Sequence, residues 1–182
     1  MAYNSVIISS GHGLYVPGAC GIINEVDEAR HVVDRVVNEL RLRGIDAKSF
    51  HDAVSYTQRE NLSRIVDFHN DHIRDLDISV HFSCYEQVSK PMGVEVLYVT
   101  QAEIAGFVSL AIANSGGLIN RGAKKHTDLY FLNSTEAPAI LIKVCFVDSE
   151  ADCIAYRDHF DEICWAIAAV ICGDEVGEGS VT

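Results

Sequence analysis

Short runs of apolar, mostly β-branched residues alternate along this chain with stretches in which apolar residues recur at spacings of three and four. This alternation is the pattern of α/β units packed around a largely parallel sheet. Residues 139–147 are apolar except for Lys143, which is typical of a strand covered on both faces. We therefore predict a twisted, mixed, mostly parallel sheet with helices on both faces. Strands are expected over residues 5–10, 46–51, 77–84, 92–100, 128–132 and 139–147, and helices over residues 25–44, 57–73, 102–114 and 150–172.

The length of 182 residues lies in the usual range of one domain, and 48% hydrophobic content can build a substantial core. We assign residues 1–172 to that domain. Residues 173–182 are acidic and contain glycine, so we expect a short flexible tail there.

The formal net charge of −12 and the sequence pI of about 4.9 argue against nucleic acid as a partner. Nucleic-acid phosphates require clustered Lys and Arg, and the pair Lys124-Lys125 is too short to supply them. The longest apolar run, residues 163–172, is far shorter than a membrane-spanning helix, so no membrane insertion is expected. The oligomeric state is left open.

The first residues contain no basic stretch that leads into an apolar stretch of signal-peptide length. We therefore expect the chain to be synthesised in the cytoplasm without a signal peptide. The six cysteines include no Cys-x-x-Cys pair and are expected to be reduced, mostly packed thiols. His69, His72 and His159 fall on predicted helices and are expected to face solvent. His126 precedes a predicted strand and is a candidate for lining a cleft.

Three residues have the types that hold zinc while leaving one coordination position open, namely His12, Glu25 and His81. His12 lies in a glycine-flanked loop after the first predicted strand, Glu25 begins the next helix, and His81 lies near the carboxyl end of a later strand. Ligands gather at that edge of open α/β sheets, so these side chains can converge although 13 and 56 residues separate them. Spacing alone leaves open that His81 is a hydrogen-bonded structural histidine. Asp27 and Glu28 also follow Glu25, but the helix dipole explains acidic residues in a first turn.

Six segments occur in the order found in zinc-dependent N-acetylmuramoyl-L-alanine amidases, including the catalytic domains of phage and prophage endolysins. They are Ser10-Gly11-His12-Gly13, Asn24-Glu25, Ser79-Val80-His81-Phe82-Ser83, Gly93-Val94-Glu95-Val96, Asn120-Arg121-Gly122 and residues 138–146. The chain resembles this family over nearly its whole length. The resemblance implies that His12, Glu25 and His81 bind one zinc ion, and that the substrate is the amide between muramic acid and L-alanine in peptidoglycan. It also implies a substrate-binding role for Glu95 and Arg121, although a strand-face contact and a turn explain these two residues equally well.

Two positions depart from the family pattern. Ser83 stands where the family usually carries asparagine, a modest change beside the expected metal. Lys143 stands where the family carries the glutamate that accepts a proton from the attacking water and passes one to the leaving nitrogen. A carboxylate can do this work near neutral pH, whereas a protonated ammonium cannot.

A general base contributes about 10²–10⁴-fold to the rate, so its replacement weakens turnover without requiring complete loss. The ammonium of Lys143 can swing away from zinc, lose its proton or lower the metal affinity, and a lysine that simply reaches solvent is the structural alternative. Three functions stay open: a weakened zinc amidase, a pseudoenzyme that binds peptidoglycan or muropeptide without cutting it, and a metallohydrolase for another amide. A prophage-type lysis role with holin-type release and a cytoplasmic muropeptide role are both compatible with the sequence.

Overall fold

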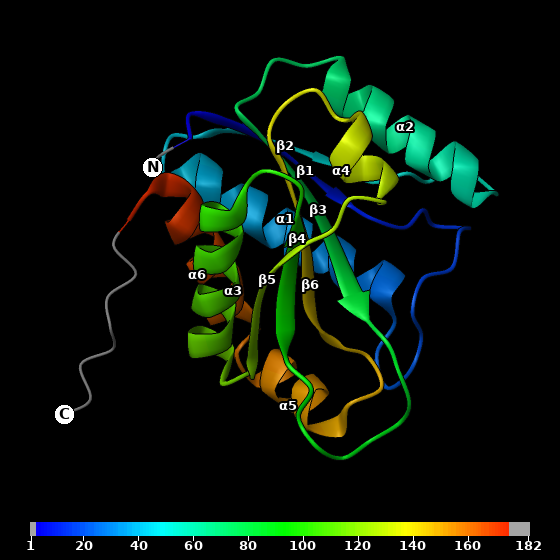
Figure 1. The fold of residues 1–182 in the computed structure, drawn as a ribbon, viewed down its shortest axis with the longest axis vertical. Coiled ribbons are helices and arrows are strands. Elements are labelled where there is room, and N and C mark those ends of the chain that lie inside the picture. Colours follow the sequence, from blue (N-terminus) through cyan, green and yellow to red (C-terminus); the bar gives the residue numbers. More distant parts are fainter. Residues whose placement is uncertain (1–2, 175–182) are drawn as a thin grey trace.

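A six-stranded sheet in the order β2-β1-β3-β6-β4-β5 organises the computed structural model, which describes residues 3–174 (Figure 1). Strands β2, β1, β3 and β6 run parallel, whereas β4 pairs antiparallel with β6 and parallel with β5. The predicted mixed, mostly parallel sheet is confirmed. The strands are β1 (Ser5–Ser10), β2 (Asp46–Phe50), β3 (Leu76–Ser83), β4 (Val94–Tyr98), β5 (Asn120–Lys125) and β6 (Ala139–Phe146).

Helices cover both faces of the sheet, as predicted. Helices α1 (Glu25–Leu42), α3 (Ala102–Gly116) and α6 (Phe160–Cys172) pack on one face, and α2 (Gln58–Asn70) and the short α4 (Tyr130–Ser134) lie on the other (Figure 1). Helix α5 (Glu150–Asp158) connects the end of β6 to α6. Alternate residues of β6 enter the two cores, with Ile142 in the larger one and Leu141 in the smaller one under α2 and α4. Burial on both faces explains the continuous apolar run in β6.

Side-chain caps set where several helices begin. Asn24 Oδ1 accepts a hydrogen bond from the Val26 N–H at 2.8 Å, so α1 begins at Glu25. Thr57 and Glu60 form a capping box at the start of α2, where a helix was predicted to begin. The first of these caps matters for function, because it places the Glu25 carboxylate at a helix amino terminus next to the carboxyl ends of the parallel strands.

Two predictions for the second half of the chain are wrong. Residues 128–132 do not form a strand, since Tyr130–Ser134 is α4 and the sheet ends instead at β5. Strand β5 reads Asn-Arg-Gly-Ala-Lys-Lys, and a polar edge strand carries no apolar alternation by which to recognise it. The single helix predicted over residues 150–172 is interrupted at His159, whose backbone (φ −121°, ψ 27°) leaves the helical region.

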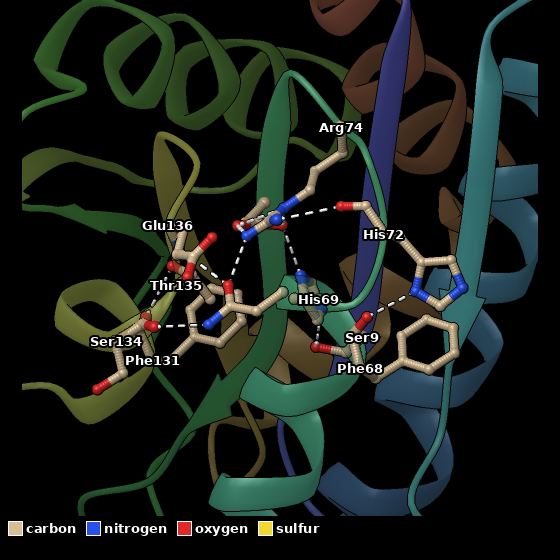
Figure 2. Close-up of polar contacts among 11 residues, drawn as sticks. Ser9, Phe68, His69, His72, Arg74, Phe131, Ser134, Thr135 and Glu136 are labelled. Atoms are coloured by element: carbon tan, nitrogen blue, oxygen red, sulfur yellow. Dashed lines mark hydrogen bonds and ion pairs between the residues drawn. The ribbon is translucent and has the colours of Figure 1, made fainter.

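His69 is a further correction, because it faces the core rather than solvent. Its Nδ1 lies 2.7 Å from Asp77 Oδ1 and its Nε2 lies 3.1 Å from Ser9 Oγ (Figure 2). Arg74 completes the network, with Nε donating to both carboxylate oxygens of Asp77 at 2.9 and 3.1 Å. Ser9, His69 and Asp77 are connected by hydrogen bonds in the same order as the residues of a catalytic triad, but all three side chains are fully buried. The network therefore ties α2 to β1 and β3 and has no access to a substrate.

Within residues 3–174, no helix combines the length and the apolar composition that crossing a membrane requires. The predicted flexible tail, residues 173–182, lies from residue 175 onward outside the described part of the chain.

Candidate metal centre and its cleft

Three separate segments bring His12, Glu25 and His81 together at the carboxyl edge of the parallel strands. His12 lies in the loop after β1, Glu25 opens α1, and His81 lies near the end of β3. His12 Nε2 is 3.6 Å from Glu25 Oε2, and His81 Nδ1 is 3.0 Å from Glu25 Oε1. One donor atom from each residue lies within 4.8 Å of the other two. Two imidazoles and one carboxylate in this arrangement can hold a metal ion.

Backbone groups hold the Glu25 carboxylate in place. The residue is buried, and it accepts hydrogen bonds from the Phe82 N–H at 2.9 Å and from the Ala19 N–H. Burial by itself would raise the pKa of Glu25, but His81, His12 and the Phe82 N–H outweigh it and lower that pKa to about 2. Burial also lowers the pKa of His12, although the negative charge of Glu25 acts in the opposite direction and raises it. At neutral pH these two residues thus present a carboxylate and a neutral imidazole, the forms that bind metal ions.

Two glycines leave room for the ligand side chains. A Cβ atom on Gly11 would lie 1.9 Å from the His81 ring, and a Cβ atom on Gly18 would lie 2.5 Å from Glu25 Oε2. Neither position accepts even alanine unless a ligand side chain moves. Asn61 of α2 also braces the loop, since its Nδ2 donates to the Gly11 carbonyl at 3.0 Å. The sequence drew attention to Gly11 through its neighbour His12, but Gly18 had no such signal.

The group of His12, Glu25 and His81 opens into a cleft of about 740 Å³ between the loop at residues 17–19 and the ends of β3, β4, β5 and β6. All of the site residues predicted from sequence line this one cleft: His12, Glu25, His81, Glu95, Arg121 and Lys143. Strand β4 runs antiparallel to β6, so its amino end, which carries Glu95, reaches the same edge of the sheet. His126 is exposed and is not part of the lining of this cleft.

Lys143 directs its charge toward Glu95. The two residues stand directly opposite each other on β6 and β4, and Lys143 Nζ lies 3.7 Å from Glu95 Oε1. The other oxygen, Glu95 Oε2, is 3.1 Å from Arg121 Nε and 3.1 Å from Lys124 Nζ. Burial alone would raise the pKa of Glu95, but Lys124, Arg121 and Lys143 outweigh it and hold the pKa below its ordinary value. One carboxylate is therefore shared by three cations.

Lys124 belongs to this cluster, although the sequence did not indicate it. In a regular strand, residues 121 and 124 face opposite sides of the sheet, because side chains alternate. Here Gly122 has a φ of 78°, and the register between β4 and β5 shifts between Val94 and Val96. This irregularity allows both cations to reach Glu95. The available signal was the glycine itself, since glycine inside a strand often marks a bulge.

A mostly parallel α/β sheet with a His-Glu-His group at its carboxyl edge defines an α/β domain with a candidate metal site and an adjoining cleft. The chain belongs to the N-acetylmuramoyl-L-alanine amidase family, whose model matches residues 6–172. The family resemblance inferred from the motifs is thus confirmed. The individual roles of Lys143, Glu95 and Arg121 stay predictions.

Two proteins of Clostridium perfringens are similar to this chain in sequence. The chain is 34% identical over 173 residues to an uncharacterized 38.4 kDa protein of Clostridium perfringens, covering 92% of this chain and 50% of that protein. A second Clostridium perfringens protein is 28% identical over 163 residues, covering 84% of this chain and 47% of that protein. The chain thus spans about half the length of these relatives.

Two solved structures show the same fold. The catalytic domain of the CD27L endolysin targeting Clostridia difficile has a TM-score of 0.86 at 23% identity, covering 95% of this chain and 99% of that chain. The N-acetylmuramoyl-L-alanine amidase of Clostridium difficile 630 has a TM-score of 0.80 at 21% identity, covering 98% of this chain and 99% of that chain.

Proposed function

We propose that this chain is a zinc-dependent N-acetylmuramoyl-L-alanine amidase that acts on peptidoglycan with turnover weakened by Lys143. The observation that carries the proposal is the His12, Glu25 and His81 group, which lines the cleft, in a chain that belongs to the amidase family. The substrate amide would lie in the cleft beside this group.

The donor set suits zinc. Donor atoms about 2.0–2.2 Å from a tetrahedral zinc ion lie roughly 3.3–3.6 Å from one another. His12 lies 3.6 Å from Glu25 Oε2 and His81 lies 3.0 Å from Glu25 Oε1, and one donor atom of each residue lies within 4.8 Å of the other two, so small side-chain rotations would bring three donors to this separation. Gly11 and Gly18 provide the space that lets the ligand side chains approach each other. When bound, zinc supplies Lewis-acid polarisation of the scissile carbonyl and activation of water.

Proton transfer is the step that this cleft supports poorly. A protonated Lys143 has no lone pair with which to accept a proton, and its charge is directed at Glu95. Glu95 is a poor replacement base, because its three cationic neighbours stabilise the carboxylate and oppose its protonation. Loss of the general base alone lowers the rate by about 10²–10⁴-fold, which leaves measurable hydrolysis.

The same ion pair favours a second function, that of a pseudoenzyme that binds peptidoglycan or muropeptide without cutting it. In that case the cleft and the metal serve recognition, and the Lys143–Glu95 pair is part of the binding surface. Both functions include binding of peptidoglycan or muropeptide, but only the amidase hydrolyses it. Measuring binding and hydrolysis together therefore separates the two functions.

The test is to measure the amino groups released from purified peptidoglycan, with zinc added, by the wild type, Lys143→Glu and the double variant Lys143→Glu/His81→Ala. Restoring the carboxylate is expected to raise turnover about 10²-fold or more, and removing His81 is expected to abolish the gain. Lys125→Glu is the charge-matched control, because Lys125 is exposed, lies on the same strand as Lys124 and has no ion pair with Glu95. Its turnover should equal that of the wild type.

Two other outcomes change the conclusion. Equal, His81-dependent turnover in the wild type and Lys143→Glu would show that the chain hydrolyses its substrate without a carboxylate at this position. Muropeptide binding without hydrolysis by either protein would support the pseudoenzyme.

A further inference from the structure

Two exposed tyrosines stack against each other close to the candidate metal centre. Tyr15 lies in the loop after β1 and Tyr56 in the loop after β2, and their ring centroids are 5.0 Å apart at an interplanar angle of 9°. Despite this contact, Tyr15 is 50% exposed and Tyr56 is 74% exposed. Leu14 and Val54, in the same two loops, are also exposed. These four side chains form the tyrosine platform, and exposed apolar side chains grouped in this way mark an interaction site.

Hydrogen bonds to Asp52 hold the platform in place. The Leu14 N–H donates to the Asp52 carbonyl at 2.8 Å, which joins the two loops. The buried Asp52 carboxylate accepts hydrogen bonds from the Val54 N–H at 3.1 Å and from the Ser55 N–H at 3.2 Å. The loops that carry the stacked rings are therefore ordered before a ligand arrives, which lowers the entropy cost of binding.

The platform and the cleft lie along the same edge of the sheet, with the candidate metal centre between them. In the strand order β2-β1-β3-β6-β4-β5, the cleft extends from the metal group toward β6, β4 and β5, whereas the platform follows β1 and β2. The four platform side chains are not part of the cleft lining. Tyr15 follows His12 by three residues, a separation of at most about 11 Å along the chain. A ligand that crosses the metal group thus reaches the cleft on one side and the platform on the other.

The chemistry of the platform fits a sugar chain. The amide of the proposed substrate joins a sugar acid to a peptide, so a substrate that lies across the metal group places its sugar and its peptide on different sides. One face of a pyranose ring carries C–H groups that pack on an aromatic ring, and tyrosine hydroxyls can hydrogen-bond to sugar hydroxyls. A muramic acid whose carboxyl group forms the amide has no charge. The glycan is therefore not repelled by a chain of formal net charge −12.

We propose that Tyr15 and Tyr56 bind the glycan strand of peptidoglycan, with a sugar ring stacked on the more exposed Tyr56. This proposal rests on the proposed function in one respect, namely that peptidoglycan is the substrate. Binding at the platform holds the strand beside the metal group and requires neither zinc nor hydrolysis. The ligand class is an uncharged oligosaccharide of N-acetylated amino sugars.

The test is an NMR titration of the protein with N-acetylchitotetraose. This probe has N-acetylated sugar rings joined by the same linkage as the glycan strand, and it has no peptide and no muramoyl-peptide amide. Chelator-treated and zinc-loaded protein are both titrated, and the two affinities are expected to agree. We expect saturable shifts of the backbone amide signals of residues 13–16 and 53–56.

Variants identify the rings responsible. Tyr56→Ala is expected to weaken binding of the tetramer about tenfold and Tyr15→Ala about threefold or more, because each removes an aromatic stacking contact. Tyr56→Phe keeps the ring and should bind within about threefold of the wild type. Phe107→Ala is the matched control, because Phe107 is also an exposed aromatic residue but lies on α3, which packs against β4 and β5 at the other end of the sheet. Circular dichroism and melting temperature establish that each variant is folded.

Two results would overturn the proposal. The first is an equal affinity of the wild type and Tyr56→Ala for the tetramer, or the absence of saturable shifts in the platform loops. The second is a dimer in sedimentation velocity that Tyr56→Ala abolishes, which would assign the platform to self-association. The amidase proposal is judged separately, because hydrolysis by Lys143→Glu can succeed while sugar binding fails, and the tetramer can bind to a protein that hydrolyses nothing.

Discussion

His81 and Lys143 occupy the same register position on the neighbouring parallel strands β3 and β6. Adjacent strands lie about 4.8 Å apart, so the backbone at residue 143 is next to that of a candidate metal ligand. Any charge placed at residue 143 therefore acts on the metal group. The structure directs the Lys143 ammonium to Glu95 on the opposite neighbour, β4, which reduces that effect without removing it.

Zinc affinity should depend on the charge at residue 143. A cation at about 5 Å from a site of net charge near +1 is repelled by roughly 3 kcal/mol at an effective dielectric near 20, and partial exposure of Lys143 reduces this further. We expect Lys143→Gln to bind zinc about tenfold more tightly than the wild type and Lys143→Glu to bind it more tightly still. Competition with a chromophoric chelator measures these affinities. Identical affinities in all three proteins would show that the charge at residue 143 does not act on the metal group.

Gly18→Ala should disrupt the metal group. The added methyl would lie 2.5 Å from Glu25 Oε2 and 2.8 Å from His12 Cδ2, so at least one ligand must move. We expect zinc affinity to fall by about 10-fold to 100-fold, as when partners that orient a ligand are lost. Gly106→Ala is the control, because a Cβ atom there meets nothing within 4 Å and the residue lies inside helix α3. The control should keep its zinc affinity and gain about 0.5–1 kcal/mol of stability from the better helix former.

His69→Ala should destabilise the fold without changing the residues that line the cleft. The change leaves a cavity between α2 and β3 and removes the partner of the buried Asp77 carboxylate, which keeps only its bonds to Arg74. The cavity and the loss of a hydrogen-bond partner of the buried carboxylate together cost about 3–5 kcal/mol. Urea unfolding gives the difference in the free energy of unfolding. Asp67→Ala, on the exposed side of the same helix, should change it by less than about 0.5 kcal/mol.

Stability should fall as the pH drops from 7 toward 5. Burial lowers the pKa of His69 in the folded protein, although the hydrogen bond to Asp77 opposes this shift, so the folded protein binds this proton less readily than the unfolded chain does. The unfolded chain binds a proton near the ordinary histidine pKa of about 6.5, so the free energy of unfolding decreases below that pH. His12 adds an effect of the same sign, because its pKa is also lowered. The slope of unfolding free energy against pH should be smaller in His69→Gln than in the wild type, and an equal slope would contradict the assignment to His69.

Much of the architecture was predictable because it depends on local chemistry. The apolar runs at β1, β3 and β6 and the caps at Asn24, Thr57 and Ser149 are encoded within a few residues, so the corresponding strands and helix starts were found. Strand β5 was not predicted, and helix α4 was predicted as a strand, because neither element is encoded by a local pattern. An edge strand needs no apolar face, and the burial of Phe131 and Leu132 comes from tertiary packing on the sheet rather than from strand pairing.

The sequence by itself determined which chemical groups the cleft contains: two histidines and a glutamate, which are donor types that suit a metal ion, and a lysine at residue 143. Only the tertiary structure decided how these groups meet. The parallel register of β3 and β6 sets Lys143 beside His81, and the antiparallel register of β6 and β4 sets it opposite Glu95. Strand register is set by long-range pairing and packing across the whole sheet, so no local pattern around Lys143 could reveal the carboxylate to which it binds.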